Sequence, residues 1–223
     1  MKLTKKLYES TKDIWDTYYK HPFVVGLSNG SLDIDKFKFF MIQDYLYLLE
    51  YAKVFALGVA KATSEKNMRK FSSVLNSVLN EEMEIHKSYM KRLGIKESDI
   101  ENAKPSIVNT SYTNYMLQIG YSKGELEILV SILACSWSYK EIGERLSKDK
   151  SMLDHKLYGE WIKGYSSDEY IKSNEEIMEL VDELGKDITE EHFDVLKDIF
   201  INCSRYEYMF WDMSYKKEMF YIC

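Results

Sequence analysis

The sequence predicts an all-α protein, and three observations lead to this expectation. Glycine and proline, which interrupt regular structure, number only 10 and 2 among 223 residues. Apolar residues recur every three or four positions over long segments, which is the spacing of one face of a helix. Strands would need turn residues about every 8 to 12 positions, and the turn residues of this chain are spaced far more widely. With 45% apolar residues, the helices can bury a sizeable core.

In the first half of the chain, apolar residues at helical spacing predict three long helices, at residues 3–20, 33–63 and 65–92. The first must end before Pro22, because proline disfavours the α conformation in the residue that precedes it. A short apolar turn or helix with an Asn-Gly pair separates the first helix from the second. The third is expected to stop at Gly94, since glycine is the residue that most often follows a helix C-terminus.

In the second half, residues 96–116 are expected to form a loop with one weak helical turn, because Pro105 and a Ser/Thr cluster interrupt the pattern. Gly164 is expected to end a short helix and to leave Tyr165 in a turn. The strongly charged segment 167–184 is expected to form a solvated outer layer. The segments with helical spacing are 124–148, 155–163, 167–184 and a last one that starts near 188.

The net charge of −6 argues against nucleic-acid binding, and no basic stripe with interleaved aromatic residues is present. We expect a small molecule or a protein as partner. No apolar run reaches the ~18 residues that a membrane span needs, and the basic start lacks the apolar core of a signal peptide. Three cysteines without a CxxC motif predict neither a disulfide framework nor a zinc site. A soluble, cytoplasmic protein is therefore expected.

One cysteine lies at the centre of the apolar face of segment 124–148. Cys135 and Tyr139 share this face with three isoleucines at helical spacing. A free cysteine in such a stripe is most often part of the core. Polar side chains from other helices are therefore needed to indicate chemistry at this thiol.

Two carboxylates, Asp44 and Glu207, lie on similar apolar faces of other helices. Burying a carboxylate is costly unless it meets a donor, so Asp44 either meets a tyrosine hydroxyl or a main-chain amide or lies at the edge of its helix face. Without a positive partner, Glu207 should have a raised pKa, which suits a general acid or base. The structural alternative is that Glu207 anchors a tyrosine or Arg205.

A polar pair lies on the apolar stripe of segment 65–92. Glu82 and His86 are one helical turn apart, which allows an intrahelical hydrogen bond or two metal ligands. A satisfied polar couple is the preferred interpretation.

If the apolar faces with Asp44, Cys135 and Glu207 converge, the core contains a cavity with a thiol, two acids and several tyrosines. Such a cavity suits a flat polar ring, because aromatic walls stack on the ring and a carboxylate accepts from its N–H groups. The thiol would be the nucleophile, and the second carboxylate would donate a proton to a leaving group.

Five short motifs occur in the order, and at about the spacing, of the TenA/thiaminase II family, which the chain resembles over nearly its whole length. The motifs are FFMIQDYLYLLEYAKVFA, NEEMEIHKSYMKRLGI, SYT at 111–113, ILACSWSYKEIGE and SRYEYMFWDMSYKKE. The resemblance implies one haem-oxygenase-like helical domain over residues 1–223, a homotetramer, and no metal or cofactor. It also implies aminopyrimidine aminohydrolase (thiaminase II) activity in thiamine salvage, which converts 4-amino-5-aminomethyl-2-methylpyrimidine, or thiamine, into 4-amino-5-hydroxymethyl-2-methylpyrimidine.

The resemblance further implies roles for individual residues. Cys135 matches the family's nucleophile, which adds to the pyrimidine ring, and Asp44 matches the carboxylate that holds the ring nitrogen and the 4-amino group. Glu207 matches the acid that protonates the departing amine and later assists water. The tyrosines that match those stacking on the ring or bonding to these groups are Tyr47, Tyr112, Tyr139 and Tyr165.

The group that deprotonates Cys135 is left open by the sequence. A thiol on an apolar face should have a raised pKa. Lys140 lies off the apolar stripe that carries Cys135. Either Glu207 or a tyrosine must therefore take the thiol proton, or the helix setting must lower the pKa of the thiol. Of the other cysteines, Cys203 is expected to serve packing, and Cys223 to be a dispensable terminal thiol.

Two other classes of function are alternatives. A haem or di-iron oxygenase on the same bundle would need metal ligands such as Glu-x-x-His pairs. No glutamate lies three residues before any of the four histidines, which are His21, His86, His155 and His192. A non-catalytic binder or regulator that holds thiamine or its pyrimidine would keep the tyrosines without needing a thiol, so the presence of Cys135 together with Glu207 favours the enzyme.

Overall fold

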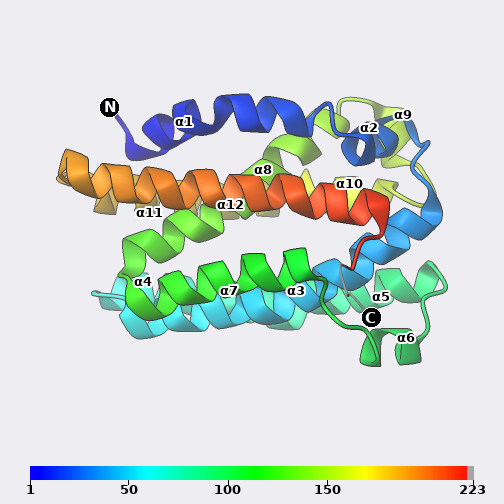
Figure 1. The fold of residues 1–223 in the computed structure, drawn as a ribbon, viewed down its shortest axis with the longest axis horizontal. Coiled ribbons are helices and arrows are strands. Elements are labelled where there is room, and N and C mark those ends of the chain that lie inside the picture. The colour runs from blue at the N-terminus through cyan, green and yellow to red at the C-terminus, as the bar shows by residue number, and fades with distance from the viewer. Residues whose placement is uncertain (220–223) are drawn as a thin grey trace. The chain divides into compact units, whose positions relative to one another are not determined.

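The computed structural model describes residues 1–219, and over that range it contains helices and no strand, which confirms the all-α prediction (Figure 1). Cys223, expected to be a dispensable thiol, lies outside the described residues. The elements are α1 (Leu3–Tyr18), α2 (Pro22–Asn29), α3 (Ile34–Lys61), α4 (Glu65–Ser77), the π-helical turn η1 (Val78–Glu82), α5 (Met83–Arg92), α6 (Glu97–Glu101), α7 (Ile107–Ser122), α8 (Glu125–Leu146), α9 (Lys150–Leu153), α10 (Gly159–Tyr165), α11 (Asp168–Leu184) and α12 (Glu190–Lys216).

The helices form two compact units. The first unit contains Met1–Asp33 and Leu129–Trp211, and the second contains Ile34–Ile128 and the segment that begins at Asp212. Helices α8 and α12 therefore each contribute residues to both units. The expectation of one domain stays a prediction.

The first two helices end close to the expected positions. α1 stops at Tyr18, and His21 caps α2 by accepting the Phe23 N–H on Nδ1 at 3.1 Å. The short apolar segment is thus a helix rather than a turn. It ends at Gly30, whose φ of +76° is the left-handed conformation that glycine adopts without strain.

In the first unit, buried hydrogen bonds join α1 to α11 and α12. The Thr4 hydroxyl donates to Asp182 Oδ1 of α11 at 2.9 Å. Trp15 Nε1 donates to Ser204 Oγ of α12 at 3.0 Å, and the Tyr18 hydroxyl donates to the Ser204 carbonyl at 2.5 Å. These bonds satisfy the polar tips of two large buried aromatic side chains, which leaves their rings free to pack in the core.

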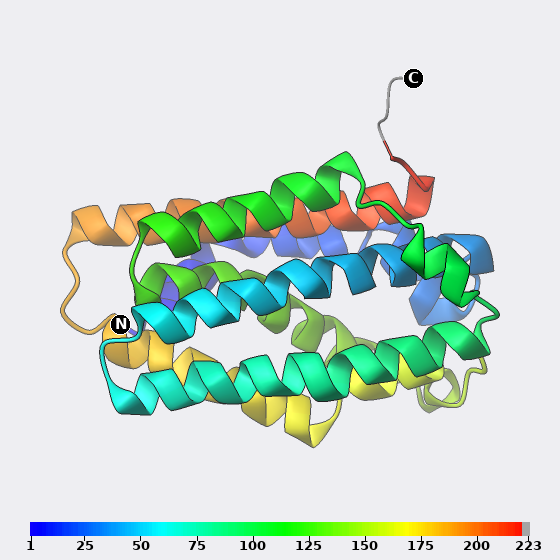
Figure 2. The same ribbon diagram turned by 90° about the horizontal axis from the view of Figure 1, so that it is seen from below.

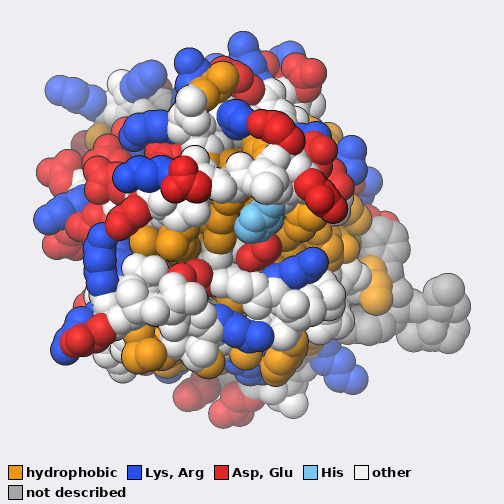
Figure 3. Space-filling model, turned by 90° about the vertical axis from the view of Figure 1, so that its left-hand side faces the viewer, with side chains coloured by type: hydrophobic (Ala, Val, Ile, Leu, Met, Phe, Trp, Pro, Cys, Tyr) orange, Lys and Arg blue, Asp and Glu red, His pale blue; other side chains and the backbone are white. Residues whose placement is uncertain are grey.

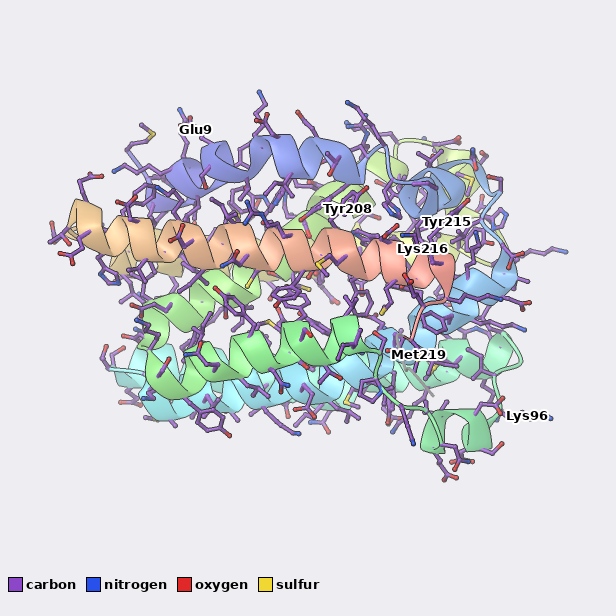
Figure 4. All side chains as sticks on the ribbon, in the orientation of Figure 1. Glu9, Lys96, Tyr208, Tyr215, Lys216 and Met219 are labelled. Carbon is purple, nitrogen blue, oxygen red and sulfur yellow. The ribbon has the colours of Figure 1, made fainter. Side chains whose placement is uncertain are left out.

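In the second unit, α3 lies between α7 on one side and α4 with α5 on the other (Figure 2). Gln43 of α3 holds the start of α7, because its Oε1 accepts the Ser106 N–H at 2.9 Å and its carbonyl accepts from Asn109 Nδ2 at 2.8 Å. Tyr215 and Lys216 lie near the end of α12, and Met219 follows it (Figure 4). The Tyr215 ring packs under the Lys36 ammonium at 3.2 Å, which joins this end to α3.

The predicted helix at 65–92 contains a turn that its periodicity did not indicate. Residues Val78–Glu82 form a π-helical turn, which adds one residue and thereby changes the direction in which later side chains point. The end of the helix is as expected. Gly94 has a φ of +75°, and the Ile95 N–H returns to the Met90 carbonyl at 3.0 Å, as in a glycine-terminated helix.

The prediction that Gly164 ends a helix and leaves Tyr165 in a turn is wrong. α10 runs through both residues to Tyr165, and Ser166 follows as the capping residue. A glycine ends a helix when it adopts a positive φ, and among the described glycines only Gly30 and Gly94 do so. Gly164 therefore continues the helix.

Charged side chains of both signs cover the surface that Figure 3 shows, where Lys and Arg side chains alternate with Asp and Glu around a group of hydrophobic side chains. Within residues 1–219, no helix combines the length and the apolar character that crossing a bilayer requires. The cysteines in this range, Cys135 and Cys203, are not joined in a disulfide.

The two glycines near helix ends provide a matched test of this description. A Cβ at either Gly94 or Gly164 would meet no atom within 4 Å, so only backbone conformation distinguishes them. Gly94→Ala should lower the free energy of unfolding by about 1 kcal/mol, because alanine is strained at positive φ. Gly164→Ala should raise it by about 0.5–1 kcal/mol, because alanine favours helix interiors. Urea unfolding of both variants measures the difference, and equal effects would contradict it.

Candidate active site

Four of the residues predicted to form a site belong to the first unit: Cys135 and Tyr139 on α8, Tyr165 on α10 and Glu207 on α12. Cys135 is half-buried and Glu207 is buried, with 2% of its surface exposed. The helical stripe that carries Cys135 is apolar on its buried side, which agrees with the sequence prediction.

The charges of Cys135 and Glu207 both affect the buried phenol of Tyr18 on α1. Burial raises the pKa of the Tyr18 phenol well above its ordinary value, the charge of Glu207 raises it further, and Cys135 and Cys203 add to this effect. Tyr18 therefore stays protonated, and its hydroxyl donates a hydrogen bond to the Ser204 carbonyl.

Cys203, the other thiol of the first unit, is not suited to be a nucleophile. Cys203 is fully buried, and burial followed by the charge of Glu207 raises its pKa well above the ordinary value. This agrees with the expectation that Cys203 serves packing. Lys140, which the sequence placed off the reactive stripe, forms an ion pair with Glu144 at 2.8 Å on its own helix.

Tyr139 and Tyr165, the other two predicted site residues of the first unit, belong to an aromatic cluster. The Tyr139 ring stacks on Trp211 of α12 at 5.0 Å and meets Tyr165 at 4.8 Å, and Trp161 lies 4.7 Å from Tyr165. Gly143 makes this approach possible, because a Cβ there would lie 2.5 Å from the Tyr165 carbonyl oxygen. Sequence reasoning did not single out Trp161 and Trp211, although Trp211 follows Glu207 by one helical turn.

The other three predicted residues, Asp44, Tyr47 and Tyr112, belong to the second unit. Tyr47 follows Asp44 by one turn on α3, and its ring lies 5.4 Å from that of Tyr112 on α7. On the other side, the Tyr47 ring stacks on Tyr51 at 5.2 Å. These rings form an aromatic wall that begins one helical turn from the Asp44 carboxylate.

The partner of Asp44 differs from the expected one. Asp44 is 4% exposed, and its Oδ2 lies 2.8 Å from His86 Nε2 of α5, where a tyrosine hydroxyl or a main-chain amide was expected. His86 is 42 residues away in sequence, and only the packing of α5 against α3 brings it to Asp44. From the sequence, His86 was expected to form a polar pair with Glu82.

The expected pair of Glu82 and His86 is present, but His86 contacts the main chain of Glu82 and not its side chain. His86 Nδ1 lies 3.0 Å from the main-chain carbonyl of Glu82, while its side-chain partner is Asp44. Burial raises the pKa of the half-buried Glu82 carboxyl to about 7; the nearby His86 opposes this rise and Asp44 adds to it. Residues 1–219 contain no group of three or more His, Cys, Asp or Glu side chains arranged to hold a metal ion.

Comparisons with known proteins connect these residues to a family. Residues 8–217 match the TENA/THI-4/PQQC family. A Helicobacter pylori protein named aminopyrimidine aminohydrolase is 45% identical over 216 residues, which are 97% of this chain and 100% of that protein. A solved structure described as a TenA homologue from P. horikoshii OT3 has a TM-score of 0.89 at 32% identity, covering 97% of this chain and 99% of that one.

A more distant structure bears on the fold alone. A Shewanella denitrificans domain described as having a heme oxygenase-like fold has a TM-score of 0.79 at 19% identity, covering 96% of this chain and 92% of that one. The expected haem-oxygenase-like helical fold is thereby confirmed.

The raised pKa of Glu82 predicts a pH-dependent stability. Between the ordinary value of 4.5 and the folded value of about 7, the folded protein retains a proton that the unfolded chain has lost, so rising pH costs stability in this window. Glu82→Gln cannot ionise, and it should be more stable than the wild type at pH 8 by on the order of 2 kcal/mol. At pH 4 this advantage should be absent.

Urea unfolding at both pH values measures the effect. Glu81→Gln, which removes a charge from the neighbouring exposed glutamate, is the control. The same stability difference for Glu82→Gln at pH 4 and at pH 8 would contradict the raised pKa.

Proposed function

The chain belongs to the TENA/THI-4/PQQC family, and on this premise we propose that it is a thiaminase II, an aminopyrimidine aminohydrolase that hydrolyses a C–N bond in thiamine salvage. The relative from Helicobacter pylori that carries this name matches along its whole length, which supports the assignment. The structural observation that supports the proposal is that Cys135 and Glu207 belong to the same unit and that their charges both raise the pKa of one buried phenol, Tyr18. A nucleophile and an acid are thereby available for one reaction.

We assign recognition of the substrate ring to the residues of the second unit. Asp44 accepts hydrogen bonds from the 4-amino edge of the pyrimidine, and the wall of Tyr47 and Tyr112 stacks on the ring face. The substrates proposed are 4-amino-5-aminomethyl-2-methylpyrimidine and thiamine, which share this ring. Tyr139 and Tyr165 are assigned to contacts with the ring or with the reacting groups.

The proposed reaction exchanges the amine on the exocyclic carbon for water. The Cys135 thiolate adds to a ring carbon, and the electrons displaced into the ring then expel the amine, to which Glu207 gives a proton. Water, deprotonated by Glu207, adds to the exocyclic carbon, and the thiolate leaves the ring as its aromaticity returns. The balance is one water consumed, one amine released and one hydroxymethyl product.

Glu207 is also the better assignment for the base that activates Cys135. Tyr18 keeps its proton, because its pKa is raised and its hydroxyl already donates to the Ser204 carbonyl. Lys140 is engaged with Glu144. A carboxylate that takes the thiol proton is then already in the acid form needed to protonate the leaving amine.

Replacing the nucleophile tests the proposal. Cys135→Ser should lower the rate of product release by at least about 1,000-fold, because a hydroxyl is a far weaker nucleophile than a thiolate, while affinity for the pyrimidine stays within about 3-fold. Cys203→Ser is the matched control and should keep turnover. Chromatographic detection of the hydroxymethyl product and calorimetric binding measure both quantities. Undiminished turnover by Cys135→Ser would remove the cysteine from the mechanism.

Replacing the carboxylate tests ring recognition. Asp44→Asn turns one acceptor into a donor, so both affinity and kcat/KM should fall, each by on the order of 10- to 100-fold. Steady-state kinetics and binding of the hydroxymethyl product check this. If the variant binds and reacts as the wild type does, Asp44 does not hold the ring. Pyrimidine binding without turnover by the wild type would instead identify a non-catalytic carrier or regulator.

A further inference from the structure

His86 lies between two hydrogen-bond acceptors. Its Nδ1 is 3.0 Å from the main-chain carbonyl of Glu82, and its Nε2 is 2.8 Å from Asp44 Oδ2. A main-chain carbonyl can only accept, so Nδ1 must carry a proton. The hydrogen bond to Glu82 thus determines the state of one ring nitrogen.

The contact at Nε2 then has two descriptions with the same number of protons. Either His86 is a doubly protonated imidazolium that donates to an Asp44 carboxylate, or a neutral imidazole accepts from a protonated Asp44. A contact of 2.8 Å between two buried polar atoms requires a proton between them in both cases. The pair therefore holds one proton more than a neutral histidine beside a carboxylate.

The surroundings favour the imidazolium. Among the described residues, the charged groups that act on His86 are Asp44 of α3 and Glu82 of η1, and both are negative when ionised. Burial lowers the pKa of the imidazolium, but the hydrogen bond and charge of Asp44, together with the charge and carbonyl of Glu82, outweigh burial and raise it above the ordinary value of 6.5. A carboxyl group is also intrinsically the stronger acid of the two.

We propose that His86 is a positioning residue whose imidazolium donates from Nε2 to Asp44 Oδ2, so that the other oxygen of Asp44 is directed as an acceptor to the amino edge of the substrate ring. This inference rests on the proposed function, because it concerns the residue assigned to hold the pyrimidine. The π-helical turn η1 supplies the Glu82 carbonyl that orients the imidazole.

The direct test observes the protons on His86 in the intact protein. In 15N-histidine NMR at pH 7.5, one of the four histidines should show both ring nitrogens protonated, and its signals should be absent from His86→Gln. They should persist in His192→Gln, a matched change on α12. In Asp44→Asn, His86 should lose the second proton at this pH. A wild-type His86 with a proton on Nδ1 alone would overturn the proposal.

Binding of 4-amino-5-hydroxymethyl-2-methylpyrimidine, measured by calorimetry, tests the positioning role. His86→Gln keeps an N–H donor for Asp44 without the charge and should weaken binding about 10-fold, whereas His86→Leu, which removes both, should weaken it about 100-fold. In the Asp44→Asn background, His86→Gln should have no further effect, since His86 acts through Asp44. Equal losses in both backgrounds, or no loss in either, would overturn the inference.

The NMR and binding experiments distinguish failure of the role of His86 from failure of the proposed function on which it rests. If the wild type neither binds nor converts the pyrimidine, the proposed function fails, while the NMR experiment still reports the state of the pair. If the wild type binds and converts it and the His86 variants do so equally well, the function stands and the role of His86 fails.

Discussion

The hydrogen bond between His86 Nε2 and Asp44 Oδ2 is the interaction that gives the buried acid of α3 its partner. A carboxylate removed from water costs several kcal/mol unless a donor or a positive charge meets it. His86 meets that requirement at one oxygen, and main-chain Glu82 fixes the other side of the imidazole. A buried acid is thereby retained beside the tyrosines of α3 and α7 without an uncompensated charge.

In the first unit, a thiol on α8 and an acid on α12 lie within a mostly apolar core. Two long aromatic side chains of α1, Trp15 and Tyr18, have their polar tips satisfied by hydrogen bonds to Ser204 of α12. The two thiols of this unit differ in burial: Cys203 is fully buried, whereas Cys135 is half-buried. Only Cys135 has the solvent exposure that a nucleophile needs.

Local sequence patterns predicted most of the long helices, because apolar periodicity and capping residues act within one segment. They were wrong for residues 96–116, which were expected to form a loop but contain α6 and the start of α7 at Ile107. They did not predict the π-helical turn at Val78–Glu82, since its residues are ordinary helix formers and the extra residue is decided by packing. Gly94 and Gly164 look alike in sequence, yet only one adopts a positive φ. The partner of Asp44 was equally out of reach, because tertiary packing alone brings His86 to it.

The most direct test of the central claim is the fate of water oxygen during the reaction of 4-amino-5-aminomethyl-2-methylpyrimidine in 18O-labelled water. The account predicts that the wild type releases ammonia and that the hydroxymethyl product carries 18O on its exocyclic carbon, with the 4-amino group intact. Thiamine run in parallel ranks the two substrates. Label found on the ring carbon that bears the 4-amino group, or a bound pyrimidine returned unchanged, would contradict the account.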